Sequence, residues 1–264
     1  MRARDRIILP LDVSNVDAAI ALVHQLEPHV GVFKVGFEAI YSTMAELLLC
    51  SEEELLAFTR KVRTLAGAIT PEKAFLDVKM ADISNTVGNG AKALSRLQAH
   101  MFNIHASAGR KAIEAAVANR GGSKVFGVTV LTDIDEDECK SIFGDGPGKK
   151  VVQFAEFLLD YGADGVICAP AEGLLLRQDT KFNSLEIATP NVRPPWMMTE
   201  GERARVNDDQ DIKRQLTPAA AMRARIDKIV IGRPITKPSP EIGGPVKAAQ
   251  LIAEQMAEIT GEEP

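Results

Sequence analysis

The chain has 264 residues, of which 45% are hydrophobic and 25% charged, an ordinary globular composition that can bury a sizeable core. Acidic residues exceed basic ones by 36 to 31, and the net charge of −5 disfavours non-specific binding to nucleic acid. No apolar stretch has the length of a membrane span and no signal-peptide pattern opens the chain, so we expect a cytoplasmic protein with no membrane partner.

Eight short, apolar and often β-branched runs predict strands along the chain. They span Ile7–Leu11, Gly31–Val35, Ala74–Val78, Met101–Ile104, Lys124–Val130, Gly165–Cys168, Leu185–Ala188 and Lys228–Ile231. Segments with helical spacing lie between them, namely Val16–Leu26, Glu52–Leu65, Gly90–Leu97, Lys111–Ala118, Val151–Tyr161, Pro218–Ala224 and Pro245–Ile259. Ser14 is the expected N-cap of the first of these helices.

This order of strand followed by helix predicts a mostly parallel sheet, and eight such units predict a closed (β/α)8 TIM barrel. We expect residues 1–264 to form one barrel domain, because α/β barrels often reach this size as a single unit. Two long segments, Thr132–Lys149 and Pro190–Ile212, are expected to be loops. The second is the obvious candidate for a lid, since long loops in compact domains are usually functional.

Catalytic groups of such barrels lie at the carboxyl ends of the strands. The predicted strands end at Asp12, Lys34, Asp77 with Lys79, His105, Thr132, Ala169-Pro170, Arg193 and Arg233. Five of these eight ends carry a group that is charged at neutral pH. Structural ion pairs would explain one or two of them, but their recurrence at the same end of successive strands favours a reaction site.

The most informative segment is Asp77-Val-Lys-Met-Ala-Asp-Ile-Ser-Asn-Thr86, which follows the third predicted strand. Asp77 and Lys79 are two residues apart, so on an extended chain their side chains point the same way. Asp82 comes where the chain should be leaving the strand for a loop. Charged groups are rarely buried unless they are paired, so this cluster is either an expensive ion pair or a reaction site.

A second signal lies at the last two strand ends. Gly232 lets backbone N–H groups approach a ligand closely, and Arg233 can hold an oxyanion with its planar guanidinium. Arg193 follows the seventh strand, and phosphate sites of barrels usually form after strands seven and eight. One arginine alone would more often be a surface charge, but a pair at this place favours a phosphate site.

With these motifs the chain resembles the orotidine 5′-monophosphate decarboxylase family. The motif Asp-x-Lys-x-x-Asp-Ile-x-Asn-Thr is matched by residues 77–86. Further blocks agree in order, from Leu9-Pro-Leu-Asp12 through Phe33-Lys-Val-Gly36, His105-Ala-Ser-Ala-Gly109, Val128-Thr-Val-Leu-Thr132, Val166-Ile-Cys168, Thr189-Pro-Asn-Val-Arg-Pro194, Asp208-Asp-Gln210 and Leu216-Thr-Pro218 to Ile231-Gly-Arg-Pro-Ile-Thr236. The resemblance therefore covers nearly the whole chain.

The resemblance implies decarboxylation of orotidine 5′-monophosphate to UMP, with Lys79 as the proton donor and Asp77 beside the departing carboxylate. It implies that Asp12 and Lys34 hold the ribose hydroxyls, with Lys34 also part of the charged array. Thr132 would seat the pyrimidine, and the phosphate would be bound by Arg193, Gln210, Gly232 and Arg233. Asp82, with Ile83 and Thr86, would reach into the site of a partner subunit, so a homodimer with shared active sites is expected.

The sequence departs from the family at several positions. Met80-Ala81 replaces a Phe-His pair, Ser84 stands where proline is usual, and Asn191 replaces a glycine. Asparagine is, after glycine, the residue that best tolerates a left-handed backbone, so we expect that conformation at Asn191. None of these changes removes a charged residue, so the expected reaction stands.

Neither a cofactor nor a metal is expected. The three cysteines and four histidines lack metal-ligand spacing, and no Gly-x-Gly-x-x-Gly pattern is present. His105 is interpreted as a structural histidine, because the reaction needs no imidazole. Two alternatives stay open: a Mg²⁺-dependent sugar-phosphate decarboxylase resembling 3-keto-gulonate 6-phosphate decarboxylase, and a barrel that binds nucleotides or anions without catalysis. The first typically has a metal-binding acid where this chain has Lys34.

Overall fold

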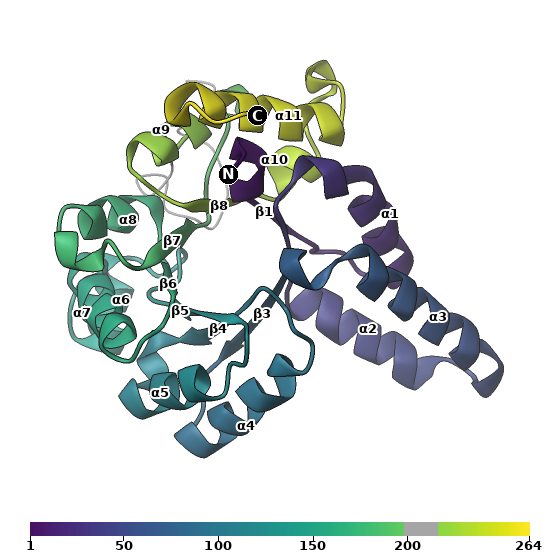
Figure 1. The fold of residues 1–264 in the computed structure, drawn as a ribbon, viewed down its shortest axis with the longest axis horizontal. Helices are drawn as coiled ribbons and strands as arrows, with labels where there is room; N and C mark the ends of the chain where they lie inside the picture. Colours follow the sequence, from purple (N-terminus) through teal and green to yellow (C-terminus); the bar gives the residue numbers. More distant parts are fainter. Residues whose placement is uncertain (198–215) are drawn as a thin grey trace.

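Eight parallel strands form a closed barrel in the computed structural model, which describes residues 1–197 and 216–264 (Figure 1). The strands are β1 Ile7–Pro10, β2 Val32–Val35, β3 Ala74–Met80, β4 Met101–His105, β5 Lys124–Val128, β6 Gly165–Ile167, β7 Glu186–Thr189 and β8 Lys228–Val230. Each pairs with the next along the chain, and β8 pairs with β1 to close the ring. The predicted barrel is confirmed, with every strand boundary within two residues of its expected place.

Helices surround the barrel on the outside (Figure 1). They are α1 Val16–Leu26, α2 Phe37–Leu49, α3 Glu52–Ala68, α4 Ser84–Ser95, α5 Arg110–Ala118, α6 Glu136–Phe143, α7 Pro147–Asp160, α8 Pro170–Arg177, α9 Pro218–Arg223, α10 Arg233–Thr236 and α11 Pro245–Thr260. In the described parts of the chain, no helix combines the length and apolar character needed to span a membrane.

Several local expectations were wrong. The segment Thr132–Lys149 is not a plain loop, because it contains α6 and the start of α7. Asp135 caps α6 by accepting a hydrogen bond from the backbone N–H of Glu138 at 2.8 Å, and acidic residues in its first turn favour the helix. The N-cap of α1 is Asn15 rather than Ser14, with its side chain accepting from the backbone N–H of Ala18.

The inward-facing side chains of the strands lie in layers. The middle of the barrel is filled by an apolar cluster of Ile8, Val32, Phe75, Met101, Phe126 and Ala188. Towards the amino ends of the strands, Lys124 of β5 forms an ion pair with Glu186 of β7. Towards the carboxyl ends, Lys34, Asp77 and Asn103 come two residues after members of the apolar cluster on β2, β3 and β4. Alternation along each strand therefore puts these polar groups on top of an apolar floor.

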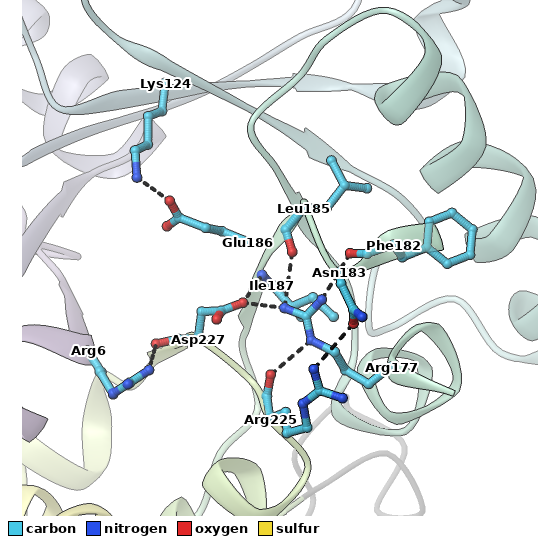
Figure 2. A network of polar contacts seen from close by, with 10 residues as sticks. All are labelled: Arg6, Lys124, Arg177, Phe182, Asn183, Leu185, Glu186, Ile187, Arg225 and Asp227. Carbon is cyan, nitrogen blue, oxygen red and sulfur yellow. Dashed lines mark hydrogen bonds and ion pairs between the residues drawn. The ribbon is translucent and has the colours of Figure 1, made fainter. Parts of the chain in front are cut away.

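A polar network joins β7, β8 and α8 at the amino ends of the strands, opposite the carboxyl ends where a site is expected (Figure 2). Arg177 forms an ion pair with Asp227 and donates hydrogen bonds to the carbonyl oxygens of Phe182, Leu185 and Arg225. The guanidinium thus satisfies carbonyl groups that precede both strands. We interpret this network as structural, because groups at this face of such barrels usually serve stability.

Candidate active site

A cavity of about 330 Å³ opens at the carboxyl ends of the strands. Most of the predicted site residues line it: Asp12, Lys34, Asp77, Lys79, Thr132, Arg193, Gly232 and Arg233. Apolar side chains such as Phe75, Ile167 and Val230 also contribute to the lining. An apolar pocket with a few convergent charged groups is the usual form of a small-molecule site.

Asp77 is the centre of the charged groups and is only 4% exposed. One carboxylate oxygen, Oδ2, lies 2.7 Å from Lys34 Nζ, and the other, Oδ1, lies 2.6 Å from Lys79 Nζ. Lys34 Nζ is also 3.6 Å from Oδ1 of Asp12, at the end of β1. The expected array of Asp12, Lys34, Asp77 and Lys79 is therefore brought together by three neighbouring strands.

The ionisation of Asp77 follows from its neighbours. Burial by itself raises the pKa of the Asp77 carboxyl, but the charges and hydrogen bonds of Lys34 and Lys79 outweigh burial and lower the pKa below its ordinary value. The carboxylate is therefore ionised at neutral pH and holds negative charge against both ammonium groups. Burial and the nearby charge of Lys79 lower the pKa of His105, which keeps this imidazole neutral as expected for a structural histidine.

The backbone at Lys79 is irregular. In the β3–β4 pair, Leu76 lies opposite Phe102 and Met80 opposite Ile104, so β3 uses two more residues than β4 over this stretch. Within this bulge Lys79 has a φ of 42°, a left-handed value that is uncommon outside glycine. Bulges often redirect a side chain near an active site. Here Lys79 Nζ remains on Asp77 and also lies 5.4 Å from the ring centroid of Phe37.

Sequence reasoning missed Asn103 of β4, which is fully buried and lines the cavity. Its Nδ2 donates a hydrogen bond to Oδ1 of Asp77 at 2.6 Å, and its Oδ1 accepts one from the backbone N–H of Lys79 at 2.7 Å. The available signal was a single amide in the apolar run Met-Phe-Asn-Ile-His, two residues before the strand end. Because side chains alternate along a strand, an inward Met101 implies an inward Asn103, which would have placed Asn103 beside Asp77.

The ends of β7 and β8 bring the two arginines of the predicted phosphate site to the same cavity. Arg193 is 8% exposed, and its backbone N–H donates to the carbonyl oxygen of Leu216 at 2.9 Å. Arg233 is exposed and begins α10 directly after Gly232. A Cβ on Gly232 would lie 2.8 Å from Pro10, so a larger residue would crowd β1. Arg193, Gly232 and Arg233 thus line the same cavity, as expected.

Two expectations in the same region have different outcomes. Asn191 has a φ of 61°, so the left-handed backbone expected for an asparagine in place of glycine is confirmed. Gln210, the predicted bridge from the lid to the phosphate, lies outside the described residues, as does most of the Pro190–Ile212 segment. Its role stays a prediction.

The second half of the motif lies apart from the cavity of its own chain. Asp82, Ile83 and Thr86 are exposed, and Ile83 retains 70% of its accessible surface at the start of α4. Oδ1 of Asp82 accepts a hydrogen bond from the backbone N–H of Ile83 at 2.7 Å. None of these three is among the described residues that line the cavity, whereas Asp77 and Lys79 are. The motif is thus divided between an inward half and an outward half.

Metal-ligand geometry is not found within residues 1–197 and 216–264, where no three His, Cys, Asp or Glu side chains are grouped closely enough to hold an ion. Among the described residues that line the cavity, the acidic ones are Asp12 and Asp77, and both face Lys34 instead. Positive charge is therefore supplied to this carboxylate pair by a lysine ammonium.

Comparisons with known proteins agree with this geometry. The sequence profile of the "Orotidine 5'-phosphate decarboxylase / HUMPS family" matches residues 5–250. Relatives named orotidine 5'-phosphate decarboxylase from Syntrophomonas wolfei and Heliobacterium modesticaldum are 33% and 34% identical, each over 98% of this chain and over 100% and 98% of their own lengths. The crystal structure of orotidine 5'-phosphate decarboxylase from Lactobacillus acidophilus superposes with a TM-score of 0.69 at 28% identity, covering 97% of this chain and 99% of that one. The chain therefore belongs to the orotidine 5'-phosphate decarboxylase / HUMPS family.

Proposed function

We propose that this protein decarboxylates orotidine 5′-monophosphate to UMP and CO₂ without a cofactor. The observation that carries the proposal is the Asp77 carboxylate, which bridges Lys34 and Lys79 on an apolar floor. The same cavity is lined by Arg193 and Arg233, two groups suited to a phosphate. Full-length relatives named for this reaction support the same substrate. The proposal includes the cytoplasmic location expected for nucleotide synthesis.

The reaction requires an unusual stabilisation. When the bond between C6 and the carboxylate breaks, the electron pair stays on C6, where no carbonyl is placed to delocalise it. Fixed charges that face the developing anion can supply this stabilisation in a site with little water. The Lys79 ammonium is the group proposed to face C6, where it first opposes the negative charge and then transfers its proton to the carbon. CO₂ leaves, and Lys79 regains a proton from solvent.

Asp77 has two roles in this proposal. Its ionised carboxylate holds the two ammonium groups in place before substrate arrives, so the site does not have to reorganise during the reaction. It also lies beside the substrate carboxylate that departs. Lys34 and Asp12 bind the ribose hydroxyls, since they lie next to this centre at the ends of β2 and β1. Thr132, on the other side of the lining, contacts the pyrimidine.

The phosphate is remote from C6, yet its binding energy can orient the nucleotide and thereby serve the transition state. Arg193, Gly232 and Arg233 form the described part of the phosphate site, with Gln210 proposed to complete it. Of the two arginines, Arg193 is buried and Arg233 is exposed.

The rival function, a Mg²⁺-dependent sugar-phosphate decarboxylase of the same superfamily, is disfavoured by Lys34 at the end of β2 and by the names of the full-length relatives. An absorbance assay with orotidine 5′-monophosphate, run with and without EDTA, separates the two. We expect full activity after EDTA treatment, because every cation in the proposed mechanism is a side chain. A loss of activity that Mg²⁺ restores would favour the rival decarboxylase. Binding of the nucleotide without any turnover would instead indicate a non-catalytic barrel.

We also propose that two copies of the chain form a dimer in which Asp82, Ile83 and Thr86 of one subunit complete the site of the other. Their outward position next to the inward half of the motif supports this. Along its length, α2 adds an exposed apolar stripe, Phe37, Tyr41, Met44 and Leu48, at helical spacing. Phe37 lies against Lys79, so this stripe begins at the cavity mouth. Apolar patches of this kind often mark interfaces.

Mixing two inactive variants tests the shared site. In a dimer of one Lys79→Ala and one Asp82→Ala subunit, one site contains both substitutions and the other contains neither. We therefore expect an equimolar, re-equilibrated mixture to recover about a quarter of wild-type activity per subunit, since random pairing makes half of the dimers mixed. Steady-state rates of the two variants alone and mixed provide the measurement.

The control mixture pairs Lys79→Ala with Asp77→Ala. Both residues belong to the same cavity, so every site in that mixed dimer lacks one of them, and no recovery is expected. If the Asp82→Ala mixture stayed as inactive as this control, with mixed dimers present, Asp82 would serve its own subunit and the shared site would be wrong.

A further inference from the structure

We propose that Asn103 is a positioning residue that fixes Lys79 and Asp77 in the geometry needed for proton transfer. The inference rests on the proposed function, because it assumes that Lys79 is the proton donor. Asn103 would not touch the reacting carbon itself. It would act through the two residues that it holds, one by the backbone and the other by the side chain.

Both the nitrogen and the oxygen of the Asn103 side-chain amide form hydrogen bonds. Its Nδ2 donates to Oδ1 of Asp77 at 2.6 Å, the same oxygen that lies 2.6 Å from Lys79 Nζ. Its Oδ1 accepts from the backbone N–H of Lys79 at 2.7 Å. The side chain is fully buried on β4, so water does not compete for these bonds. One amide thus fixes the carboxylate that orients the ammonium and the backbone that carries it.

The backbone of Lys79 requires such a partner. Within the β3–β4 bulge the regular ladder is interrupted, and the left-handed φ of 42° is unfavourable for a lysine. Backbone conformations of this kind persist only where the surroundings over-determine them. The hydrogen bond from Lys79 N–H to Asn103 replaces the missing ladder bond and thereby holds the residue in this conformation.

Only an amide fits both contacts at once. A carboxyl in the same place could accept from the Lys79 N–H, but it would face Oδ1 of Asp77 with a second acceptor oxygen. An aliphatic side chain of the same size could make neither bond. Asn103→Asp therefore removes the donor alone, whereas Asn103→Leu removes both bonds.

We expect both variants to lower kcat at neutral pH by on the order of 100-fold, the effect of displacing a reacting group by about 1 Å. KM should change by no more than about threefold, because the proposed phosphate contacts Arg193 and Arg233 remain in place at the ends of β7 and β8. Steady-state kinetics with orotidine 5′-monophosphate measure both constants, and circular dichroism with thermal melting shows whether each variant is folded.

The pH profile separates positioning from a merely structural role. In Asn103→Asp two carboxyls face each other, so as the pH falls they share a proton, and the protonated group can again donate to its neighbour. We expect the kcat of Asn103→Asp to recover at least about tenfold, relative to wild type, between pH 8 and pH 5.5, whereas Asn103→Leu shows no such recovery. The control is Ser123→Ala, which removes a 2.6 Å hydrogen bond from a buried side chain at the opposite end of β5 and should keep wild-type kcat.

A folded Asn103→Leu or Asn103→Asp with wild-type kcat at neutral pH would overturn the inference, as would identical pH profiles for the two. These outcomes differ from a failure of the proposed function. If Lys79→Ala is inactive while the Asn103 variants keep full activity, only the positioning role is wrong. If Lys79→Ala is itself active, the proton-donor assignment has failed first.

Discussion

Lys79→Ala is expected to abolish decarboxylation, with kcat reduced by on the order of 10⁴-fold or more, because the variant loses both the charge that opposes the carbanion and the proton that quenches it. The lost groups are specific, since Lys79 Nζ lies 2.6 Å from a buried carboxylate on the cavity floor. Loss of orotidine 5′-monophosphate absorbance at high enzyme concentration measures the residual rate.

Binding provides the internal check on this result. Arg193 and Arg233, the proposed phosphate contacts, follow β7 and β8 rather than β3, so calorimetric titration with UMP should show binding by Lys79→Ala. Lys73→Ala is the matched control, because Lys73 lies just before the other end of β3, 2.8 Å from Glu27 and far along the strand from the site. Near-normal turnover by Lys79→Ala would remove the central claim of the proposed mechanism.

Arg233→Ala should lower kcat/KM for orotidine 5′-monophosphate by on the order of 10²–10³-fold, the scale of losing a charge-assisted, bidentate contact together with the orientation it provides. The chemistry at C6 should be untouched, because Arg233 reaches the substrate only through its phosphate. The phosphate-free nucleoside orotidine, a much poorer substrate, should therefore be turned over equally by the variant and the wild type. Rates for both substrates with both proteins complete this comparison.

Arg223→Ala, which removes an exposed arginine at the end of α9, should leave both substrates unaffected. Wild-type efficiency of Arg233→Ala with the phosphate-bearing substrate would show that the phosphate is bound elsewhere. An equal loss with orotidine would instead mean that Arg233 supports the fold of the site rather than the phosphate.

The strands and the charged array could be predicted from sequence because both depend on short-range patterns. Apolar, β-branched runs identify strands locally, and alternation along β3 places Asp77 and Lys79 on one face without knowledge of the rest. The position of Arg193 and Arg233 in the cavity could be predicted because barrel topology brings all carboxyl ends to one side.

What was missed depends on packing or on local capping. Helix α2 was missed because its apolar residues lie all round the helix, and none of them is buried. Helix α6 was missed because its segment is acidic and contains glycine, and only the structure shows that Asp135 is its N-cap. Asn103 carries no sequence signature, since one polar residue in a strand can be satisfied in many ways. Its importance follows only from the bulge opposite it.

If Lys79 donates its proton as proposed, the apolar side chains that close the barrel beneath Asp77 also restrict the route by which Lys79 regains one. With Phe75, Met101 and Phe126 filling the interior, protons reach the lysine through the cavity mouth, which a bound nucleotide occupies. Under the proposed mechanism, Lys79 therefore holds one proton to donate to each bound substrate. Lys79 then regains a proton only after UMP departs, because the departing product and the incoming proton use the same cavity mouth.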